Sequence, residues 1–568
     1  MSVRIADAPF AKYLAGLAAL ARLRPELSGE SLIASTSLYF VLFSNTAFWR
    51  AAVASPLQHA GWAVSLFVLV FAANAVLMAP IVWGRLAKPV IAALLPLSAI
   101  ASHYATAYGV IIDADMVGNV LHTDLPESFE LLSWRLLLSV LSAVPALLVL
   151  WRIRLLARAP GIALVRRLGF VVALVLVALI AVFASSRDLT TMLRNQRDVR
   201  YLVAPANVMV SLLKLATESE VKGPRLRVAG DARLLPRLPG ARPRLLVIVI
   251  GETARAANWG LDGYARQTTP ELARTPGVID FSDVTACGSS TEVSLPCMFS
   301  VYGREHYDKA AIRSHESLLH VLARTGVSVL WRDNQSGCKG VCEGLPTQRL
   351  DQAHDPAYCN GLRCLDGILL ADPKAWWGDG RRDHVVVLHM LGNHGPNYND
   401  RVPPAFRRYQ PVCASADLGD CSRAQIVNAY DNALLYTDHL LATAIGLLQR
   451  QSIYDPALLY VSDHGESLGE NGLYLHGMPQ AIAPDVQLRV PMIAWLSPAF
   501  ATATGIDRGC LAARAARPIT HDDLFHSVLG VMDVETDAYR AGRDLFAACR
   551  PARRSHAGAT RRSSHEDT

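Results

Sequence analysis

The 568-residue sequence predicts an α-helical membrane domain with five spans, followed by an α/β domain with a central sheet between helices. Three observations support this. Long apolar stretches are concentrated in the first third of the chain. From residue 244 onwards, short apolar segments alternate with helical ones, as is typical of α/β sheets. All ten cysteines lie between Cys287 and Cys549, well after the apolar stretches. This organisation excludes an ordinary soluble single-domain enzyme.

Five stretches approach the roughly 20 apolar residues that a bilayer-spanning helix needs. They are 31–49, 62–83, 89–111, 131–151 and 168–184. Buried core helices are the alternative, but five such stretches within the first 184 residues favour membrane spans. The first follows a charged leader without a small-residue cleavage site, so we interpret it as an anchor and not as a signal peptide.

Charged residues between the spans predict the orientation. Basic residues gather before the first span, between the second and third, and between the fourth and fifth: Arg4, Lys12, Arg22, Arg24, Arg85, Lys88, Arg152, Arg154, Arg158, Arg166 and Arg167. The loop after the third span is acidic, with Asp113, Asp115, Asp124, Glu127 and Glu130. The positive-inside rule therefore places the N-terminus in the cytosol and everything after about residue 185 outside.

The cysteines give independent support for an external domain. Their even number suggests disulfides in an oxidising compartment. Neighbouring positions suggest Cys287–Cys297, Cys338–Cys342, Cys359–Cys364 and Cys413–Cys421, which leaves Cys510 with Cys549. Sequence alone leaves this connectivity open. A zinc knuckle made of Cys338, Cys342, Cys359 and Cys364 is the competing interpretation, which the external location disfavours.

Composition divides the chain into four parts. We expect a transmembrane domain over 1–184, interfacial helices and a linker over 185–243, a catalytic domain over 244–550 and a disordered tail over 551–568. Residues 192–215 suit either a helix on the outer membrane face or an ordinary packing helix. Strands are predicted at 244–250, 326–331, 384–389, 457–462 and 490–496. The net charge of +6 suits anionic lipid surfaces and does not argue for nucleic acid.

Two predicted strands end in residues that suit a metal ion. The strand over 457–462 is followed by Asp463 and His464, and the strand over 244–250 by Gly251 and Glu252. In open α/β sheets, sites form at the carboxyl ends of strands. Carboxylates and imidazole suit a metal such as zinc. The alternative is that polar residues simply cap two strand ends.

Four further residues are candidates for the chemistry. Thr291 opens a helix-compatible run after small residues, where free amides favour an anion; a helix cap is its ordinary alternative. His394 follows the strand over 384–389, and His476 follows a Gly-rich loop, so both suit metal binding or proton transfer. Lys339 lies in a small-residue loop between cysteines and suits a phosphate; a solvated surface lysine is the alternative.

These motifs together resemble the lipid A phosphoethanolamine transferases, which include the mobile colistin-resistance enzymes and belong to the alkaline phosphatase/sulfatase superfamily. The motifs are Gly251-Glu252-Thr253-Ala254-Arg255, Thr291 in its cysteine-framed loop, Asn393-His394-Gly395-Pro396 and the run from Ser462 to Glu470. Residues 112–119, and Arg200-Tyr201-Leu202 with Pro205 and Asn207, match as well. The ordered set covers nearly the whole chain.

The resemblance implies a role for each matching residue. Glu252, Thr291, Asp463 and His464 match one tight zinc site, with Thr291 also the nucleophile. His394 and His476 match residues that bind a second metal or act as acid and base, and contact substrate. Ser336 and Lys339 match contacts to the substrate phosphate. Asn119, Thr123 and Glu127 match an outer-face loop that gives the lipid access, and their spacing of four predicts one helical face.

The implied activity is a transfer between two lipids. Phosphoethanolamine passes from phosphatidylethanolamine to Thr291 and then to a lipid A phosphate, which lowers outer-surface charge and gives resistance to polymyxins. The resemblance also implies a monomeric, multi-pass protein of the bacterial inner membrane with a periplasmic catalytic domain.

Other functions remain open. Related enzymes modify core sugars or periplasmic glucans with similar residues. A lipoteichoic-acid-synthase-like enzyme would transfer glycerol phosphate, although the ten cysteines and the segment 393–396 weigh against it. A non-enzymatic receptor with an inactive α/β domain is opposed by the intact set of Glu252, Thr291, Asp463 and His464.

Overall fold

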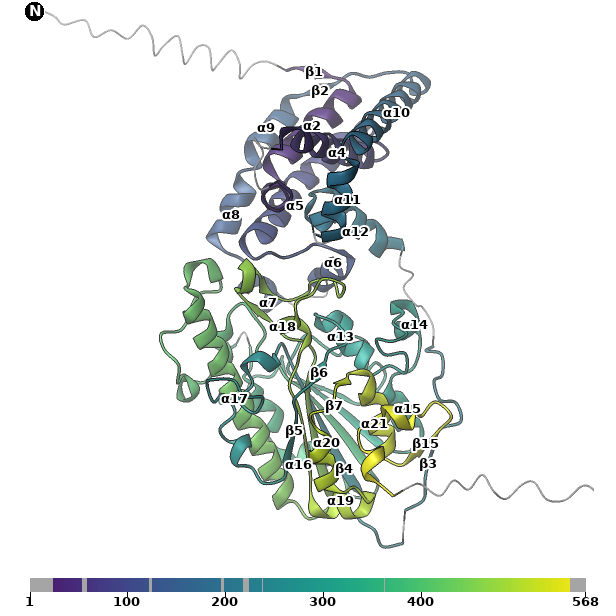
Figure 1. The fold of residues 1–568 in the computed structure, drawn as a ribbon, viewed down its shortest axis with the longest axis vertical. Coiled ribbons are helices and arrows are strands. Elements are labelled where there is room, and N and C mark those ends of the chain that lie inside the picture. The colour runs from purple at the N-terminus through teal and green to yellow at the C-terminus, as the bar shows by residue number, and fades with distance from the viewer. Residues whose placement is uncertain are drawn as a thin grey trace, which may run out of the picture. The chain divides into compact units, whose positions relative to one another are not determined.

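The computed structural model describes residues 24–53, 59–121, 125–195, 199–217, 224–237, 239–361 and 363–551. The chain divides into two compact units (Figure 1). One comprises Met1–Val117 and Leu132–Thr217, and the other comprises Gly118–Leu131 and Glu218–Thr568. The helical unit thus extends beyond residue 184, and a segment between two predicted spans groups with the sheet-containing unit.

The first unit consists of helices. They are α2 (Gly29–Phe43), α3 (Thr46–Ala52), α4 (Ala60–Met78), α5 (Ala87–Ala107), α8 (Trp134–Leu141), α9 (Val144–Arg152), α10 (Pro160–Ala184), α11 (Ser186–Asn195) and α12 (Ala206–Thr217). Four segments of the described residues are long and apolar enough to cross a membrane, and α2 with α3, bent by 64°, raises the number to five. The predicted spans are confirmed, although α10 begins eight residues before the predicted 168.

The surfaces of these helices are unusually apolar. Trp151 and Phe183 are 77% and 78% exposed. Water would penalise such surfaces, whereas lipid does not. One buried polar side chain of the unit has several partners. Asn45, at the bend between α2 and α3, donates from Nδ2 to the carbonyls of Phe40 and Ala204 and accepts from the Ala204 amide, each at 2.8 Å. This side chain therefore joins the bend to the backbone at Ala204, 159 positions later in the chain.

A seven-stranded sheet forms the centre of the second unit. Its order is β5-β13-β10-β4-β9-β7-β8. The strands are β4 (Arg244–Gly251), β5 (Val278–Phe281), β7 (Ser328–Asp333), β8 (Thr347–Arg349), β9 (His384–His389), β10 (Asp455–Ser462) and β13 (Met492–Leu496). The pairings are parallel except for those of β13 with β10 and with β5. All five predicted strands are present within two residues of their expected bounds, whereas the short edge strands β5 and β8 were not predicted.

Helices cover both faces of the sheet. The long helix α17 (Arg423–Arg450) lies on one face, and α15 (Leu318–Arg324) and α21 (Asp522–Val531) lie on the other (Figure 1). On β4, Val249 meets Leu441 and Ala444 of α17. Its neighbours Ile248 and Ile250 belong to the core that includes α15 and α21. A strand buried on both faces explains the unbroken apolar run in the sequence.

Shorter elements complete this unit. The helices are α6 (Ala114–Leu121, which spans the boundary between the units), α7 (Leu125–Glu130), α13 (Thr291–Met298), α14 (Lys309–Ser314), α16 (Pro373–Trp377), α18 (Asp485–Leu488), α19 (Pro498–Thr504) and α20 (Arg508–Arg514). Two-residue strands pair as β11 (Ser467–Leu468) with β12 (Tyr474–Leu475), β14 (Ile519–Thr520) with β6 (Val284–Thr285), and β15 (Val534–Glu535) with β3 (Arg233–Leu234).

The ten cysteines form five disulfides in the pairs that their neighbouring positions suggest. Cys338 is joined to Cys342 and Cys359 to Cys364, so these four sulfurs are not the thiolates of a zinc knuckle. Four of the bridges close loops of ten residues or fewer, whereas Cys510–Cys549 spans 39 positions and joins α20 to the last described residues.

The disulfides should differ in their contribution to stability. By loop-closure entropy, replacing both Cys510 and Cys549 with serine should lower the free energy of unfolding by about 4 kcal/mol, and the same change at Cys338 and Cys342 by about 2 kcal/mol. Urea unfolding of the purified full chain, followed by tryptophan fluorescence, measures both. Equal losses in the two variants would show that loop length does not set the effect.

Candidate active site

Two adjacent strands bring the candidate ligands together. β4 and β10 pair in parallel, with Ile250 opposite Val461 and Gly251 opposite Ser462. Glu252 follows β4 directly, and Asp463 with His464 follows β10. The two strand ends are therefore level, and carboxylates far apart in the sequence meet at one edge of the sheet.

Thr291 faces these residues from the start of α13. The helix N-cap is Ser290, and Thr291 is the first helical residue. The structure therefore rejects the capping alternative for Thr291. Its Oγ1 lies 3.1 Å from each carboxylate oxygen of Glu252 and 3.3 Å from Nε2 of His464. All four residues are buried.

The electrostatics of this cluster favour a bound cation. Glu252, Asp463 and His464 offer ligand atoms within 4.8 Å of one another. Oδ2 of Asp463 is buried and accepts no hydrogen bond. Burial lowers the pKa of His464, but the charges of Asp463 and Glu252 outweigh it and raise this pKa to about 10. The protonated imidazole of His464 thus supplies positive charge to the two buried carboxylates, as a metal ion would.

The carboxylates themselves respond in opposite ways. Burial and the charge of Glu252 raise the pKa of Asp463 to about 6. For Glu252, burial is outweighed by the hydrogen bond and charge of His464, which hold its pKa well below the usual value. Two carboxylates, one imidazole and one hydroxyl are a donor set that suits Zn²⁺. The residues present therefore fit the metal that the sequence predicts.

Two more histidines join this cluster. The ring centroids of His464 and His476 are 4.4 Å apart, and those of His394 and His476 are 5.6 Å apart. Nδ1 of His476 lies 3.3 Å from Oε2 of Glu466. The three imidazoles therefore form a continuous group that begins at His464, next to Thr291. Glu466, which contacts His476, was not predicted from the sequence.

The His394 loop is held by a buried carboxylate that the sequence did not reveal. Asp366, the first residue of η5 (Asp366–Leu370), accepts the amides of Leu391 and Gly392 at 2.8 and 2.7 Å. Burial raises its pKa. Gly392 has φ +52°, and a Cβ there would lie 2.7 Å from the carbonyl oxygen of Glu252. Only glycine permits this approach of the loop to the cluster.

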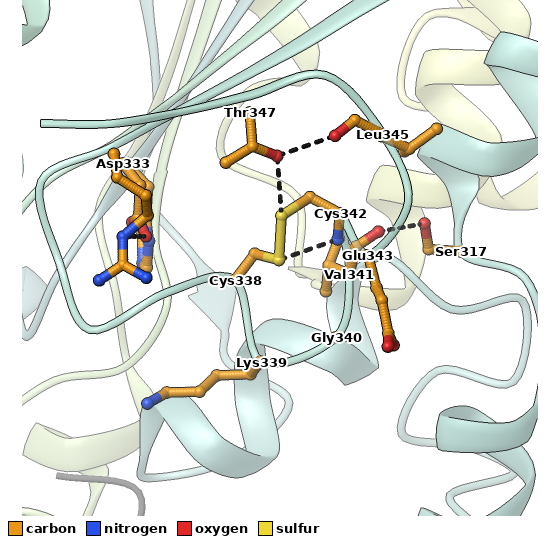
Figure 2. Close-up of a disulfide and its surroundings, with 12 residues drawn as sticks. Ser317, Asp333, Cys338, Lys339, Gly340, Val341, Cys342, Glu343, Leu345 and Thr347 are labelled. Atoms are coloured by element: carbon orange, nitrogen blue, oxygen red, sulfur yellow. Dashed lines mark hydrogen bonds and ion pairs between the residues drawn. A yellow bond between two sulfur atoms is a disulfide. The ribbon is translucent and has the colours of Figure 1, made fainter. Parts of the chain in front are cut away.

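The Lys339 loop approaches the cluster through a residue that was also missed. Gln335 Nε2 donates to Oε2 of Glu252 at 2.9 Å. In the same loop, Lys339 Nζ donates to Oγ of Ser336 at 2.9 Å. Figure 2 shows the Cys338–Cys342 disulfide bridging the loop that carries Lys339. The bridge restricts a cation-bearing loop that contacts the candidate ligand Glu252 through Gln335.

The predicted lipid-access residues are described only in part. Asn119 lies in α6 and Glu127 in α7, and Thr123 lies outside the described residues. Because residues 122–124 lie outside the described residues, the expectation that the three share one helical face stays a prediction.

His521 connects the two elements that carry the cluster. Its Nε2 donates to the carbonyl of Ser462 at 3.0 Å, and its Nδ1 accepts the amide of Cys287 at 3.1 Å. Burial lowers its pKa to about 3. A neutral imidazole thus joins the end of β10 to the loop before α13. Nothing in the local sequence distinguishes it from a surface histidine.

Comparisons with known proteins agree with this geometry. Residues 69–219 match the family model "Phosphoethanolamine transferase EptA/EptB", and residues 244–534 match the model "Sulfatase". The chain is 35% identical to "Phosphoethanolamine transferase EptA" of Salmonella typhimurium, over 93% of this chain and 98% of that protein. It is 36% identical to "Phosphatidylethanolamine transferase Mcr-1" of Escherichia coli, over 90% of this chain and 96% of that protein.

A solved structure matches as well. The integral membrane lipooligosaccharide phosphoethanolamine transferase A of Neisseria meningitidis superposes with a TM-score of 0.87 at 36% identity, covering 93% of this chain and 100% of that one. The chain belongs to the phosphoethanolamine transferase family. Membership confirms the resemblance and the fold expected from the sequence: apolar helices followed by a sulfatase-like α/β domain. It makes this chain a transferase whose family combines membrane helices with a soluble domain.

Loss of one carboxylate should remove the metal from this transferase. We expect the purified protein to carry close to one zinc ion per chain and Asp463→Asn to carry much less, because the amide cannot supply the negative charge. Elemental analysis by mass spectrometry measures the content. Asp379→Asn, an exposed carboxylate on a distant loop, is the control. Full zinc content in Asp463→Asn would refute the ligand assignment.

His521 should make the stability of this transferase depend on pH. Its folded pKa of about 3 is below its unfolded value, so the unfolded chain binds an extra proton between these pKa values. Its contribution to the free energy of unfolding should therefore fall by about 1.4 kcal/mol per pH unit as the pH drops from about 6.5 to 3. Urea unfolding at pH 7 and 5.5 should show a flatter dependence in His521→Gln. His354→Gln changes an exposed histidine and should keep the wild-type pH dependence. If both variants kept it, His521 would not be its source.

Proposed function

We propose that this transferase moves phosphoethanolamine from phosphatidylethanolamine to a lipid A phosphate through a phosphothreonine intermediate on Thr291. The observation that carries the proposal is the position of Thr291. Its hydroxyl lies at the start of a helix, within 3.3 Å of a buried carboxylate and a buried imidazole. A threonine hydroxyl needs such an environment to become a nucleophile.

In the first step, Oγ1 of Thr291 attacks the phosphorus of phosphatidylethanolamine. Glu252, Asp463, His464 and Thr291 would hold the zinc ion, which when bound lowers the pKa of the hydroxyl and neutralises charge on the phosphoryl group. The amides at the start of α13 point towards a phosphate placed at Thr291 and favour its negative charge. Lys339 supplies a positive charge on the loop next to Glu252 and contacts the substrate phosphate through its ammonium group.

The bond from phosphorus to the diacylglycerol oxygen breaks in the same step. His476 is suited to protonate this oxygen. When its Nδ1–H donates to Glu466, its Nε2 is left to hold and release a proton. His394, beside His476, serves as the partner base that completes the acid/base pair. Diacylglycerol then leaves, and phosphoethanolamine remains on Thr291.

In the second step, a phosphate oxygen of lipid A attacks the phosphorus and releases the threonine oxygen, which recovers a proton. Dividing the transfer in two lets one pocket accept each lipid in turn. The lipooligosaccharide acceptor named for the Neisseria relative supports a glycolipid acceptor over a periplasmic glucan or glycerol phosphate. The added ethanolammonium offsets negative surface charge and would weaken polymyxin binding.

We also propose an inner-membrane location, with the N-terminus in the cytosol and the catalytic unit in the periplasm. The basic residues between the apolar spans support this orientation. The five disulfides support an oxidising compartment for the residues from Cys287 to Cys549.

Mass spectrometry of lipid A from a polymyxin-sensitive Gram-negative host tests the function. Expression of the wild type should add a phosphoethanolamine group and raise polymyxin resistance, whereas Thr291→Ala should add none. Thr275→Ala, which removes a hydroxyl bonded to the Glu271 carbonyl at the end of η4 (Leu272–Arg274), is the matched control and should behave as the wild type. Full modification by Thr291→Ala would refute the intermediate. Absence of any increment from inserted wild-type protein would move the acceptor to a core sugar or a glucan.

A further inference from the structure

One acidic residue between the apolar helices is bound by the catalytic unit. Glu130 is the last residue of α7, in the segment Gly118–Leu131 that follows α5 and precedes α8 in the sequence. This segment forms one compact unit with Glu218–Thr568. The sequence pattern predicts only an acidic loop here and indicates no role for Glu130.

Two arginines hold the Glu130 carboxylate. Arg401 donates from its two terminal nitrogens to the two carboxylate oxygens, at 3.0 and 2.6 Å. Arg363 adds a contact from Nε to Oε1 at 2.8 Å. The side chains of Arg401, Arg363 and Glu130 are 2%, 15% and 16% exposed. A two-point arginine–carboxylate pair sheltered from water fixes the plane of the guanidinium and is little weakened by salt.

The same guanidinium reaches the catalytic loop. Nε of Arg401 donates to the carbonyl oxygen of His394 at 3.1 Å. Arg401 ends η6 (Tyr398–Arg401), which follows the loop after β9. All three nitrogens of one rigid planar group are therefore engaged, so the position of the Glu130 carboxylate sets the position of the His394 backbone.

The His394 loop thus has two anchors of different origin. Asp366 holds Leu391 and Gly392 from the interior of the catalytic unit. Arg401 binds the carbonyl oxygen of His394, and its carboxylate partner comes from the chain between two apolar helices. The imidazole of His394 lies beside that of His476. A shift of the loop would therefore move a residue of the acid/base pair.

We propose that Glu130 is a positioning residue for the transfer reaction: through Arg401 it holds His394 in place, so that the catalytic loop keeps its position only while Glu130 is paired with Arg401. This inference rests on the proposed function, since it assigns Glu130 a part in the same site. Glu130 does not touch the reacting atoms. We therefore expect a change at Glu130 to lower the rate of the chemical step and to leave lipid binding unchanged.

The test compares variants of the full-length protein in phosphatidylethanolamine-containing detergent micelles, with diacylglycerol release as the assay. Glu130→Gln keeps the shape and removes the charge. Arg401→Lys keeps the charge but cannot engage the carboxylate and the carbonyl together. Glu535→Gln removes the carboxylate of a distant arginine pair, with Arg233, and serves as the matched control. Thr291→Ala reports whether the assay follows the proposed chemistry.

We expect kcat to fall about tenfold or more in Glu130→Gln and in Arg401→Lys, with KM nearly unchanged, because a misplaced acid/base group slows the chemical step. Glu130→Asp, which keeps the charge on a shorter side chain, should lie between Gln and the wild type. Hydrogen exchange should become faster in the peptide that contains His394 in Glu130→Gln, and should not change in Glu535→Gln.

Two results would overturn this inference. One is a wild-type kcat in Glu130→Gln. The other is a higher KM for the lipid with unchanged kcat and unchanged exchange near His394, which would make Glu130 a lipid-binding residue. In both cases an active wild type and an inactive Thr291→Ala would leave the proposed function standing. An inactive wild type, or an active Thr291→Ala, would instead show that the proposed function had failed.

Discussion

The active site depends on placing two like charges close together without water. Glu252 and Asp463 are both fully buried, at the ends of neighbouring strands, and each can ionise only if positive charge accompanies it. His464 provides part of that charge through its raised pKa, and a divalent ion would provide more. The rest of the site follows from this constraint. The start of α13 and the loop after β9 both converge on the carboxylates, and both bring groups that favour a phosphate.

The sheet determines where this convergence occurs. Because β4, β9 and β10 run parallel, all three strands end at the same edge, and the residues that follow them meet there. Burial of β4 on both faces keeps these ends from shifting, since a change of register would break two ladders and expose core residues. The candidate catalytic side chains lie on loops. The hydrogen-bonded strands that precede these loops set the distances between them.

Much of this arrangement was readable from the sequence. Unbroken apolar runs followed by Asp463-His464 and by Glu252 predicted both strands and the meeting of these side chains at one edge of the sheet, because such runs are typical of parallel strands buried on both faces. The spans were readable from length and hydropathy alone. In contrast, His521, Gln335 and Asp366 carry no local pattern, since their partners lie far away in the chain. The edge strands β5 and β8 were missed because three or four residues are too few to show a period. The bond of Arg401 to Glu130 joins residues 271 positions apart, so no local pattern in the sequence indicates it.

The Cys287–Cys297 disulfide closes the loop on which the candidate nucleophile sits. Thr291 lies inside the loop that this bridge closes, and Cys287 also donates its amide to His521. Without the bridge Thr291 would sit on an unclosed loop, so under the proposed function the geometry around its hydroxyl would be complete only once the two cysteines had been oxidised. The bridge would then make the proposed reaction depend on the redox state of the compartment that holds this unit.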